Sequence, residues 1–310
     1  MKKTFIFIGF WPDYESLFIE NARSDDYNII IENPKEIIAR FFPPKWIPKP
    51  LRTWVEKRIF KNLLKKYQKD IFILHETRTL IEALRDTNMK VEAHILMRNI
   101  LDPNSKTGRC VLNLSILGYP IWSFDLADCA KYDFLSYKQF ISECPGIKET
   151  PIQYDLTFVG RNKGREVILN RIAKIAREQN LTTLFDIRSD GKNKKSTTYK
   201  GNISYLDYLH TLCSGYCIVD IVQENQSGLT MRPLEALIYQ RKLLTNNASI
   251  LDEDFYHPNN IFYINDMYEL QDEKLLAFLQ IESSPIEINI VQNYTLKNLL
   301  HKILLSPNHS

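Results

Sequence analysis

The residues best suited to chemistry lie between positions 226 and 235, where a polar loop leads into a predicted helix. The loop comprises Gln226, Ser227, Gly228, Leu229 and Thr230. A glycine before a helix lets the backbone approach a ligand closely, and the free N–H groups of the first turn favour an anion. Dipole attraction alone contributes only about 0.3 to 1 kcal/mol. We therefore expect Arg232, whose planar guanidinium fits two phosphate oxygens, to supply a second contact.

Glu235 stands among apolar neighbours of the same predicted helix, Leu234 and Ala236 to Ile238. An unpaired carboxylate is costly there, so Glu235 should have a partner: a ribose diol, Arg232 or a backbone amide. A purely structural ion pair between Arg232 and Glu235, three residues apart on a helix, is the alternative that the spacing leaves open.

A second candidate loop, Gly160 to Gly164, carries Arg161 and Lys163 and follows the apolar run Asp155 to Val159. A strand that runs into a glycine turn and then a helix can cradle a phosphate. The GxGxxG fingerprint is absent here and after Gly9, which disfavours NAD. A solvated basic turn is the alternative, but parallel topology would place this loop and the 226–235 segment on the same sheet edge, where both can bind one ligand.

Candidate bases follow strands of the first half of the chain. Asp13 and Glu15 come after the first predicted strand, and His75 and Glu76 come after the third. A reaction that inverts an anomeric centre needs a base for the acceptor hydroxyl, for which Asp13 is the first candidate and His75 the second; a retaining reaction needs neither. The structural alternatives are Asp13 as a helix N-cap and Glu76 as a solvated acid of a first turn.

We expect no metal site and no bound cofactor. The six histidines have no metal-binding spacing, and the HExxH and GxSxG motifs are absent. Asp252 to Asp254 match the short DxD pattern that holds a metal and a diphosphate in one glycosyltransferase architecture, but such patterns are frequent by chance.

These residues must be positioned by alternating strands and helices, which indicate parallel, doubly wound α/β domains. Strands are expected at 4–8, 28–32, 70–74, 91–97, 120–124, 155–159, 182–187, 216–222, 241–245 and 261–264. The stretch 144–154 has two prolines and a glycine and predicts a linker. We therefore expect Rossmann-like domains at 1–148 and 149–310 that face each other across a cleft, with the last helix, 296–305, able to pack back on the first domain.

Composition is that of a globular protein: 310 residues, 44% hydrophobic, 25% charged, with a net charge of +3. Five cysteines, odd in number and without CxxC spacing, favour a reducing cytoplasm. The start, MKKTFIFIGFWPDYES, superficially resembles a signal peptide, but its short apolar run and Trp-Pro-Asp ending favour a first β-strand. No apolar run approaches the roughly 20 residues that span a bilayer.

The segment 45–69 has nine basic residues against one acid, Glu56. From Pro50 it predicts a helix whose apolar side carries Leu51, Trp54, Val55, Ile59, Leu63 and Tyr67. A basic amphipathic helix with aromatic residues suits peripheral contact with an anionic membrane surface. The alternative is that the apolar side packs on the first domain and the lysines are solvated. Nucleic acid is a poorer partner, because the rest of the chain offers no basic surface to extend the patch.

Several motifs together resemble bacterial lipopolysaccharide and capsule glycosyltransferases of the GT-B type. The run from Gln226 to Thr230 with Arg232, Glu235-Ala236-Leu237 and 242–247 resembles their donor-site signature. Smaller matches are Ser123-Phe124-Asp125 with Asp128 and Lys131-Tyr132, the stretch 155–164, Phe255-Tyr256, and Asn260-Ile261-Phe262. The resemblance covers about 115 to 270.

This resemblance implies a nucleotide-sugar in the second domain and a saccharide acceptor at the first. Glu235 would hold the donor ribose, and Arg232 with the amides of Gly228 to Thr230 the diphosphate. Gly160 and Arg161 would line the same site. Such enzymes generally need no bound metal, so Arg and Lys would stabilise the leaving diphosphate.

The sequence therefore predicts a cytoplasmic, membrane-associated glycosyltransferase that moves a sugar from a nucleotide-sugar to a lipid-linked or growing surface glycan. One alternative is a hydrolase or epimerase of the nucleotide-sugar on the same fold, which would turn over the donor alone. The other is a non-catalytic scaffold of polysaccharide assembly, which has no need of Arg232 and Glu235 beside a glycine turn.

Overall fold

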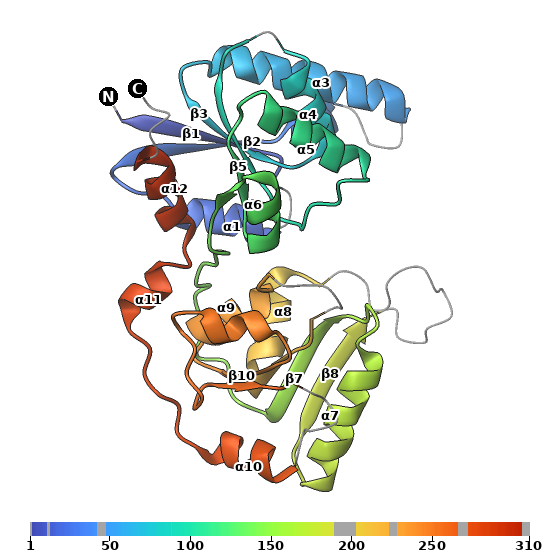
Figure 1. The fold of residues 1–310 in the computed structure, drawn as a ribbon, viewed down its shortest axis with the longest axis vertical. Coiled ribbons are helices and arrows are strands. Elements are labelled where there is room, and N and C mark those ends of the chain that lie inside the picture. Colours follow the sequence, from blue (N-terminus) through green and yellow to red (C-terminus); the bar gives the residue numbers. More distant parts are fainter. Residues whose placement is uncertain are drawn as a thin grey trace. The chain divides into compact units, whose positions relative to one another are not determined.

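The chain divides into two units, Met1–Lys138 (unit 1) and Gln139–Ser310 (unit 2), and each is built on its own parallel sheet (Figure 1). The computed structural model describes residues 2–10, 13–41, 48–87, 89–188, 203–222, 228–265 and 272–305. The predicted linker, 144–154, is irregular up to Gln153 and belongs to unit 2.

Unit 1 contains a six-stranded sheet in the order β2-β1-β3-β4-β5-β6, all pairs parallel. Its strands are β1 (Lys3–Ile8), β2 (Tyr27–Glu32), β3 (Ile71–His75), β4 (Glu92–Leu96), β5 (Ile121–Ser123) and β6 (Leu135–Ser136). Its helices are α1 (Asp13–Asn21), α2 (Pro34–Phe41), α3 (Lys49–Lys66), α4 (Arg78–Arg85), α5 (Lys106–Ile116) and α6 (Leu126–Tyr132). Phe5 to Ile8 are fully buried, as expected for a central strand of a sheet covered on both faces.

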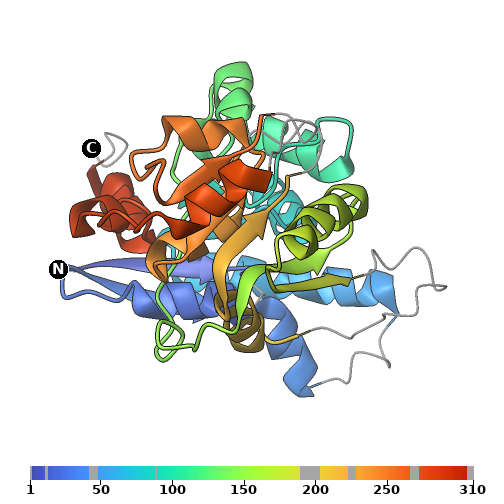
Figure 2. The same ribbon diagram turned by 90° about the horizontal axis from the view of Figure 1, so that it is seen from below.

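Unit 2 contains a five-stranded parallel sheet in the order β11-β10-β9-β7-β8. Its strands are β7 (Tyr154–Arg161), β8 (Thr183–Arg188), β9 (Gly215–Asp220), β10 (Lys242–Thr245) and β11 (Ile261–Tyr263). Its helices are α7 (Glu166–Glu178), α8 (Tyr205–Cys213), α9 (Met231–Ile238), the 3₁₀ helix η1 (Ala248–Asp252), α10 (Asp272–Gln280), α11 (Ile288–Gln292) and α12 (Leu296–Leu305). In both views α7 lies against β8, which it contacts (Figure 1, Figure 2).

The two sheets share one topology. In each, the first strand of the unit lies between the second and the third, so that the winding direction reverses beside it: between β1 and β3 in unit 1, and between β7 and β9 in unit 2. The carboxyl ends of the strands open a crevice at such a switch point, and ligands of doubly wound folds bind there.

The predicted apolar face of α3 is right for Leu63, which is buried, and wrong for Leu51 and Trp54, which are 51% and 58% exposed. Phe60 and Leu64 pack into the unit 1 core beside Leu63. On α7, Leu169 and Ile172 are buried, whereas Val167 is 79% exposed. None of the helices in the described ranges has the length and apolarity that crossing a membrane requires.

Candidate active site

Arg232 lies at the switch point of the second sheet and bridges its two central strands. Its Nη2 donates to the carbonyl oxygen of Val159 in β7 (2.8 Å), and its Nη1 donates to Oδ1 of Asp220 at the end of β9 (3.2 Å). The guanidinium also lies over the Phe158 ring, 4.7 Å from its centre. Arg232 is 9% exposed, so this charge is held in place by a fully buried carboxylate and a backbone dipole.

Gly160 leaves the space that Arg232 occupies. A Cβ atom at this position would lie 2.3 Å from Nη2 of Arg232, which is far inside van der Waals contact. The glycine is therefore required here for space beside a side chain. This close approach places the second candidate loop, 160–164, next to Arg232 of the 226–235 segment, as the sequence predicts.

The first turn of α9 has no side-chain cap. Thr230 is the N-cap residue, but its hydroxyl donates to Oδ1 of Asp220 (2.9 Å) and makes no capping bond to the helix. The amides at the start of α9 are therefore open to an anion. In addition, Nε of Arg232 is buried and has no hydrogen-bond partner in the described part of the chain. A buried donor without a hydrogen-bond partner costs free energy. An unpartnered Nε is therefore expected where a ligand or a water binds at this atom.

Glu235 is fully buried beneath two tyrosines of α8. The Tyr205 hydroxyl donates to its Oε1 (3.1 Å), the Tyr208 hydroxyl donates to its Oε2 (2.7 Å), and the two rings stack with their centres 5.7 Å apart. Burial raises the pKa of Glu235 to about 7, although the tyrosine hydrogen bonds and the charge of Arg232 lower it.

These contacts correct three expectations. The two Nη atoms of Arg232 face the protein, so only Nε is left for a phosphate, and the planar fork is not available to two phosphate oxygens. The ion pair of Arg232 is with Asp220, so the alternative pair with Glu235 is wrong. Both oxygens of Glu235 already have partners and no atom is exposed, so this conformation leaves no room for the expected ribose contact.

The other predicted donor-site residues have different outcomes. Arg161 and Lys163 are exposed in the loop that caps α7, where Asn162 bonds both ways with Glu166. Gly228 and Leu229 are buried, and the carbonyl of Gly228 accepts from Asn247 (3.2 Å). Gln226 and Ser227 lie outside the described residues.

In unit 1, His75 ends β3 at the switch point next to β1. Its Nδ1 lies 3.2 Å from Oε2 of Glu76 and 3.4 Å from the Thr77 hydroxyl, and its Nε2 has no hydrogen-bond partner in the described ranges. When Nδ1 donates to the carboxylate, the neutral ring keeps Nε2 as an acceptor, which is the arrangement of a general base. Gly9 (φ +93°) follows β1, and a Cβ atom there would lie 3.3 Å from that of His75.

Glu76 is held by two residues that follow the next strand, β4. Its Oε1 accepts from the Asn99 side chain (2.7 Å) and its Oε2 from the backbone N–H of Arg98 (3.1 Å), so the expected solvated acid is in fact buried. His75, Glu76 and Asn99 line a cavity of about 330 Å³ within unit 1 that extends to the first turn of α5. The base candidate therefore lines a cavity whose walls also include polar side chains, among them Asn99, Asp102 and Ser105.

Arg98 forms a buried ion pair beside this cavity. Its Nε donates to Oε1 of Glu15 (2.9 Å), its Nη1 donates to the Tyr137 hydroxyl (3.2 Å), and that hydroxyl donates to the Met97 carbonyl (2.6 Å). Burial lowers the pKa of Arg98, but Tyr137 and Glu15 outweigh it, so the net shift is upward. Oε2 of Glu15 is buried and has no hydrogen-bond partner among the residues that the structure describes, which makes it a second such polar atom at a carboxyl edge.

Asp13 begins α1, but its side chain lies outside the described residues, so the first base candidate stays a prediction. The described residues contain no group of three or more His, Cys, Asp or Glu that could hold a metal ion. In the DxD-like stretch, Glu253 and Asp254 both accept from the Tyr294 hydroxyl.

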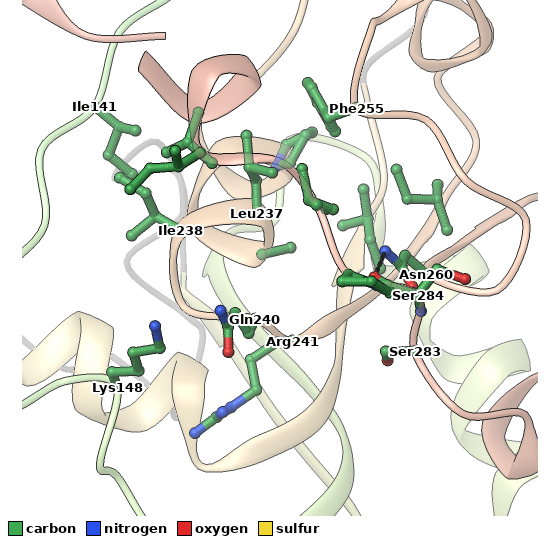
Figure 3. Close-up of a pocket in the computed structure, with 18 of the residues that line it drawn as sticks. Ile141, Lys148, Leu237, Ile238, Gln240, Arg241, Phe255, Asn260, Ser283 and Ser284 are labelled. Carbon is green, nitrogen blue, oxygen red and sulfur yellow. Dashed lines mark hydrogen bonds between the residues drawn. The ribbon is translucent and has the colours of Figure 1, made fainter. Parts of the chain in front are cut away.

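A larger cavity, of about 680 Å³, lies elsewhere in unit 2 (Figure 3). It is lined by Pro233, Ala236 and Leu237 of α9 and by none of the predicted donor-site residues. We assign the candidate chemistry to the two carboxyl edges, because Arg232, His75 and the buried pair of Arg98 and Glu15 lie there.

Asp220, Tyr205, Tyr208 and Arg98 were missed by the sequence predictions. The sequence did indicate Asp220, because it is the one charged residue in the apolar run 216–222. A carboxylate inside a buried strand needs a partner. Arg98 directly follows the predicted strand 91–97. Tyr205 and Tyr208 carried no signal, because a tyrosine on a helix is ordinary.

No family model and no curated protein matches this chain in sequence. Solved structures of similar fold include the following two. UDP-GlcNAc 2-epimerase from Neisseria meningitidis, bound to UDP-GlcNAc, has a TM-score of 0.52 at 10% identity, over 98% of this chain and 100% of that one. UDP-N-acetylglucosamine 2-epimerase from Rickettsia bellii has a TM-score of 0.49 at 14% identity, over 98% and 95%.

The first of these similarities confirms the predicted fold. The glycosyltransferase assignment stays a prediction, because a similarity in fold at 10% identity does not show an activity, and no sequence-level match supports the lipopolysaccharide and capsule resemblance. The chain has the GT-B-like fold, with two Rossmann-like α/β domains.

Proposed function

We propose that this chain is an enzyme that acts on a nucleotide-sugar, and that unit 2 holds the diphosphate of that molecule. The observation that carries the proposal is the buried Nε of Arg232, which has no partner in the described part of the chain. It belongs to the uncapped first turn of α9, at the switch point of the sheet. A diphosphate oxygen would accept from both Nε–H and the open amides.

We further infer that the reaction consumes the nucleotide-sugar without an acceptor, as an epimerase or a hydrolase. The Neisseria enzyme of similar fold was solved with UDP-GlcNAc, which supports UDP-sugars as the first class to test. Epimerisation removes a proton from one face of a sugar carbon and supplies one to the other, and hydrolysis deprotonates water, so both need an acid–base group. His75, with Nδ1 held by Glu76, supplies it.

A second candidate is glycosyl transfer to a lipid-linked or growing surface glycan. The motif set around Gln226 to Asn247 favours it, as does α3, where Leu51, Trp54 and Arg58 are exposed. An exposed tryptophan and leucine beside basic side chains suit attachment to an anionic membrane surface, here the inner face of the cytoplasmic membrane. In hydrolysis and in glycosyl transfer the α9 amides and Arg232 stabilise the leaving diphosphate, whereas in epimerisation they hold the diphosphate in place; no metal or cofactor is assigned.

Binding is tested by calorimetry with UDP-GlcNAc and other nucleotide-sugars. Gly160→Ala should weaken binding about tenfold or more, because the new methyl group displaces Arg232 from the site. Arg232→Lys should do the same, since it removes Nε, while Arg177→Lys, on the exposed face of α7, is the matched control. Unchanged affinity in both site variants would contradict the proposed diphosphate site.

Turnover is tested by incubating the protein with the nucleotide-sugar alone and separating the products by chromatography. An epimer or free nucleotide should form, and His75→Gln should lower kcat by about 10² to 10⁴ with little change in binding, as removal of a general base does. Turnover that begins only when a saccharide acceptor is added would favour the glycosyltransferase. An absence of nucleotide-sugar binding would reject both candidates.

A further inference from the structure

The cavity of about 680 Å³ in unit 2 has the volume and lining of a small-molecule site, and the proposed function does not use it (Figure 3). Its lining includes Ala236 and Leu237 of α9, which neighbour Arg232 and Glu235 on the helix, but neither Arg232 nor Glu235. Further walls come from the irregular segments 141–148 and 282–286 and from α11, through Ile288 and Val291. All of these residues belong to unit 2.

The walls suit an aliphatic chain. Leu237, Ile238, Ile286, Ile288 and Val291 are among the branched aliphatic side chains that line the cavity. Its single aromatic ring, that of Phe255, lies edge to face against Tyr294 at 5.0 Å. The cavity therefore offers no flat platform for a nucleobase. Ile288 is 76% exposed, so part of this apolar wall is left in contact with water.

The polar groups at one end already have partners. The Asn260 side chain donates to the Ser284 carbonyl (2.8 Å) and accepts from the Ser284 N–H (2.7 Å), which fixes the 282–286 segment. In Figure 3 Asn260, Ser283 and Ser284 lie together at this end, and Glu282 adjoins them in sequence. A charged head group gains little here.

The other end carries positive charge. Figure 3 places Lys148, Gln240 and Arg241 on this side. The guanidinium of Arg241 donates to the carbonyls of Cys213, Tyr239 and Thr150, and no carboxylate in the described ranges pairs with it. Lys148 is exposed and has no ion pair among those residues. Glu143, the other acid of the lining, makes an interaction of its own within the protein.

We propose that this cavity binds an amphiphile, with its aliphatic chain along α9 and an anionic head group, carboxylate or phosphate, at Lys148, beside the positive charge of Arg241. The apolar wall supplies affinity through burial of the chain, and the positive charge at this end selects the head group. Neither Arg232 nor Glu235 lines the cavity, so this proposal does not rest on the proposed function.

The test is calorimetric titration of the full chain with dodecanoate, dodecyl phosphate, dodecanol and inorganic phosphate, each below its micelle concentration. We expect saturable binding of one or both anionic amphiphiles. The relative affinities of dodecanoate and dodecyl phosphate show which head group the site prefers. Ile288→Glu should weaken binding about tenfold or more, because it places a charge against the chain. Val167→Glu on α7 is the matched control, since Val167 is 79% exposed and lies outside the cavity.

Lys148→Ala should weaken binding of the anionic amphiphiles about two- to fivefold, the range of an exposed charge contact. Its control, Lys174→Ala on α7, should leave binding unchanged. The proposal is overturned if no amphiphile binds saturably, if dodecanol or free phosphate binds as tightly as the amphiphilic anions, or if Ile288→Glu has no effect. Self-association that Ile288→Glu disrupts, without amphiphile binding, would identify a second copy of the chain as the occupant and also overturn it.

Discussion

Glu235 is a carboxyl group without an exposed atom, held by two tyrosine hydroxyls. Burial raises its pKa from 4.5 to about 7. The folded protein therefore keeps this proton up to about pH 7, whereas the unfolded chain releases it near pH 4.5. The contribution of Glu235 to stability is fully present below pH 4.5 and is lost as the pH rises through 7.

We expect Glu235→Gln to remove this pH dependence. Between pH 4.5 and 7 the free energy of unfolding of the wild type should fall, relative to the variant, by about 1.4 kcal/mol for each pH unit. Urea unfolding at half-unit steps of pH measures the difference. Glu178→Gln, an exposed glutamate on α7, is the control and should run parallel to the wild type. Parallel curves for Glu235→Gln as well would show that the carboxyl is charged in the folded state.

At the scale of an element, α3 buries Phe60, Leu63 and Leu64 in the unit 1 core and leaves Trp54 58% exposed. Phe60→Ala should therefore destabilise the protein by about 3 to 5 kcal/mol, the cost of deleting a buried phenyl ring. Trp54→Ala should cost less than about 1 kcal/mol, because Trp54 loses only its contact with Arg58. Chemical unfolding of the two variants measures this. Comparable losses would contradict the observed orientation of the helix.

The same helix shows what the sequence could and could not predict. The buried strands were predicted because each is a short apolar run between turn residues, and alternation with helices then indicates parallel sheets. On α3 apolar residues occur all around the helix, so periodicity did not select the buried face. Helices α2, α5 and α6 were not predicted from the sequence.

For the candidate site, the sequence predicted where several residues lie but not what they contact. Topology placed Gly160, Arg232 and His75 at the carboxyl edges of their sheets, because residues that follow parallel strands gather there. Their contacts could not be predicted, since the partners of Arg232 come from Val159 and Asp220, far apart in the sequence. Periodicity assigns a residue to a face of its element, but it does not identify the neighbour across that face.

At the scale of the whole molecule, each unit has its own sheet and its own hydrophobic core. The unit 2 core is formed by β7, β9 and α7 with neighbouring elements. A ligand that binds the folded form of one unit stabilises that unit by mass action and leaves a separately unfolding unit unchanged.

Calorimetric melting of the full chain should therefore give two transitions, of which UDP or a UDP-sugar raises only the one that belongs to unit 2. At a ligand concentration of about 100 times Kd the added stability is about 2.7 kcal/mol, which corresponds to an increase of about 5 to 10 °C in Tm for a unit of this size. The Gly160→Ala variant assigns the transition, because it should abolish the increase without altering the other transition. A single transition that the ligand raises as a whole would mean that the two units unfold cooperatively, and an increase confined to the other transition would place the nucleotide in unit 1.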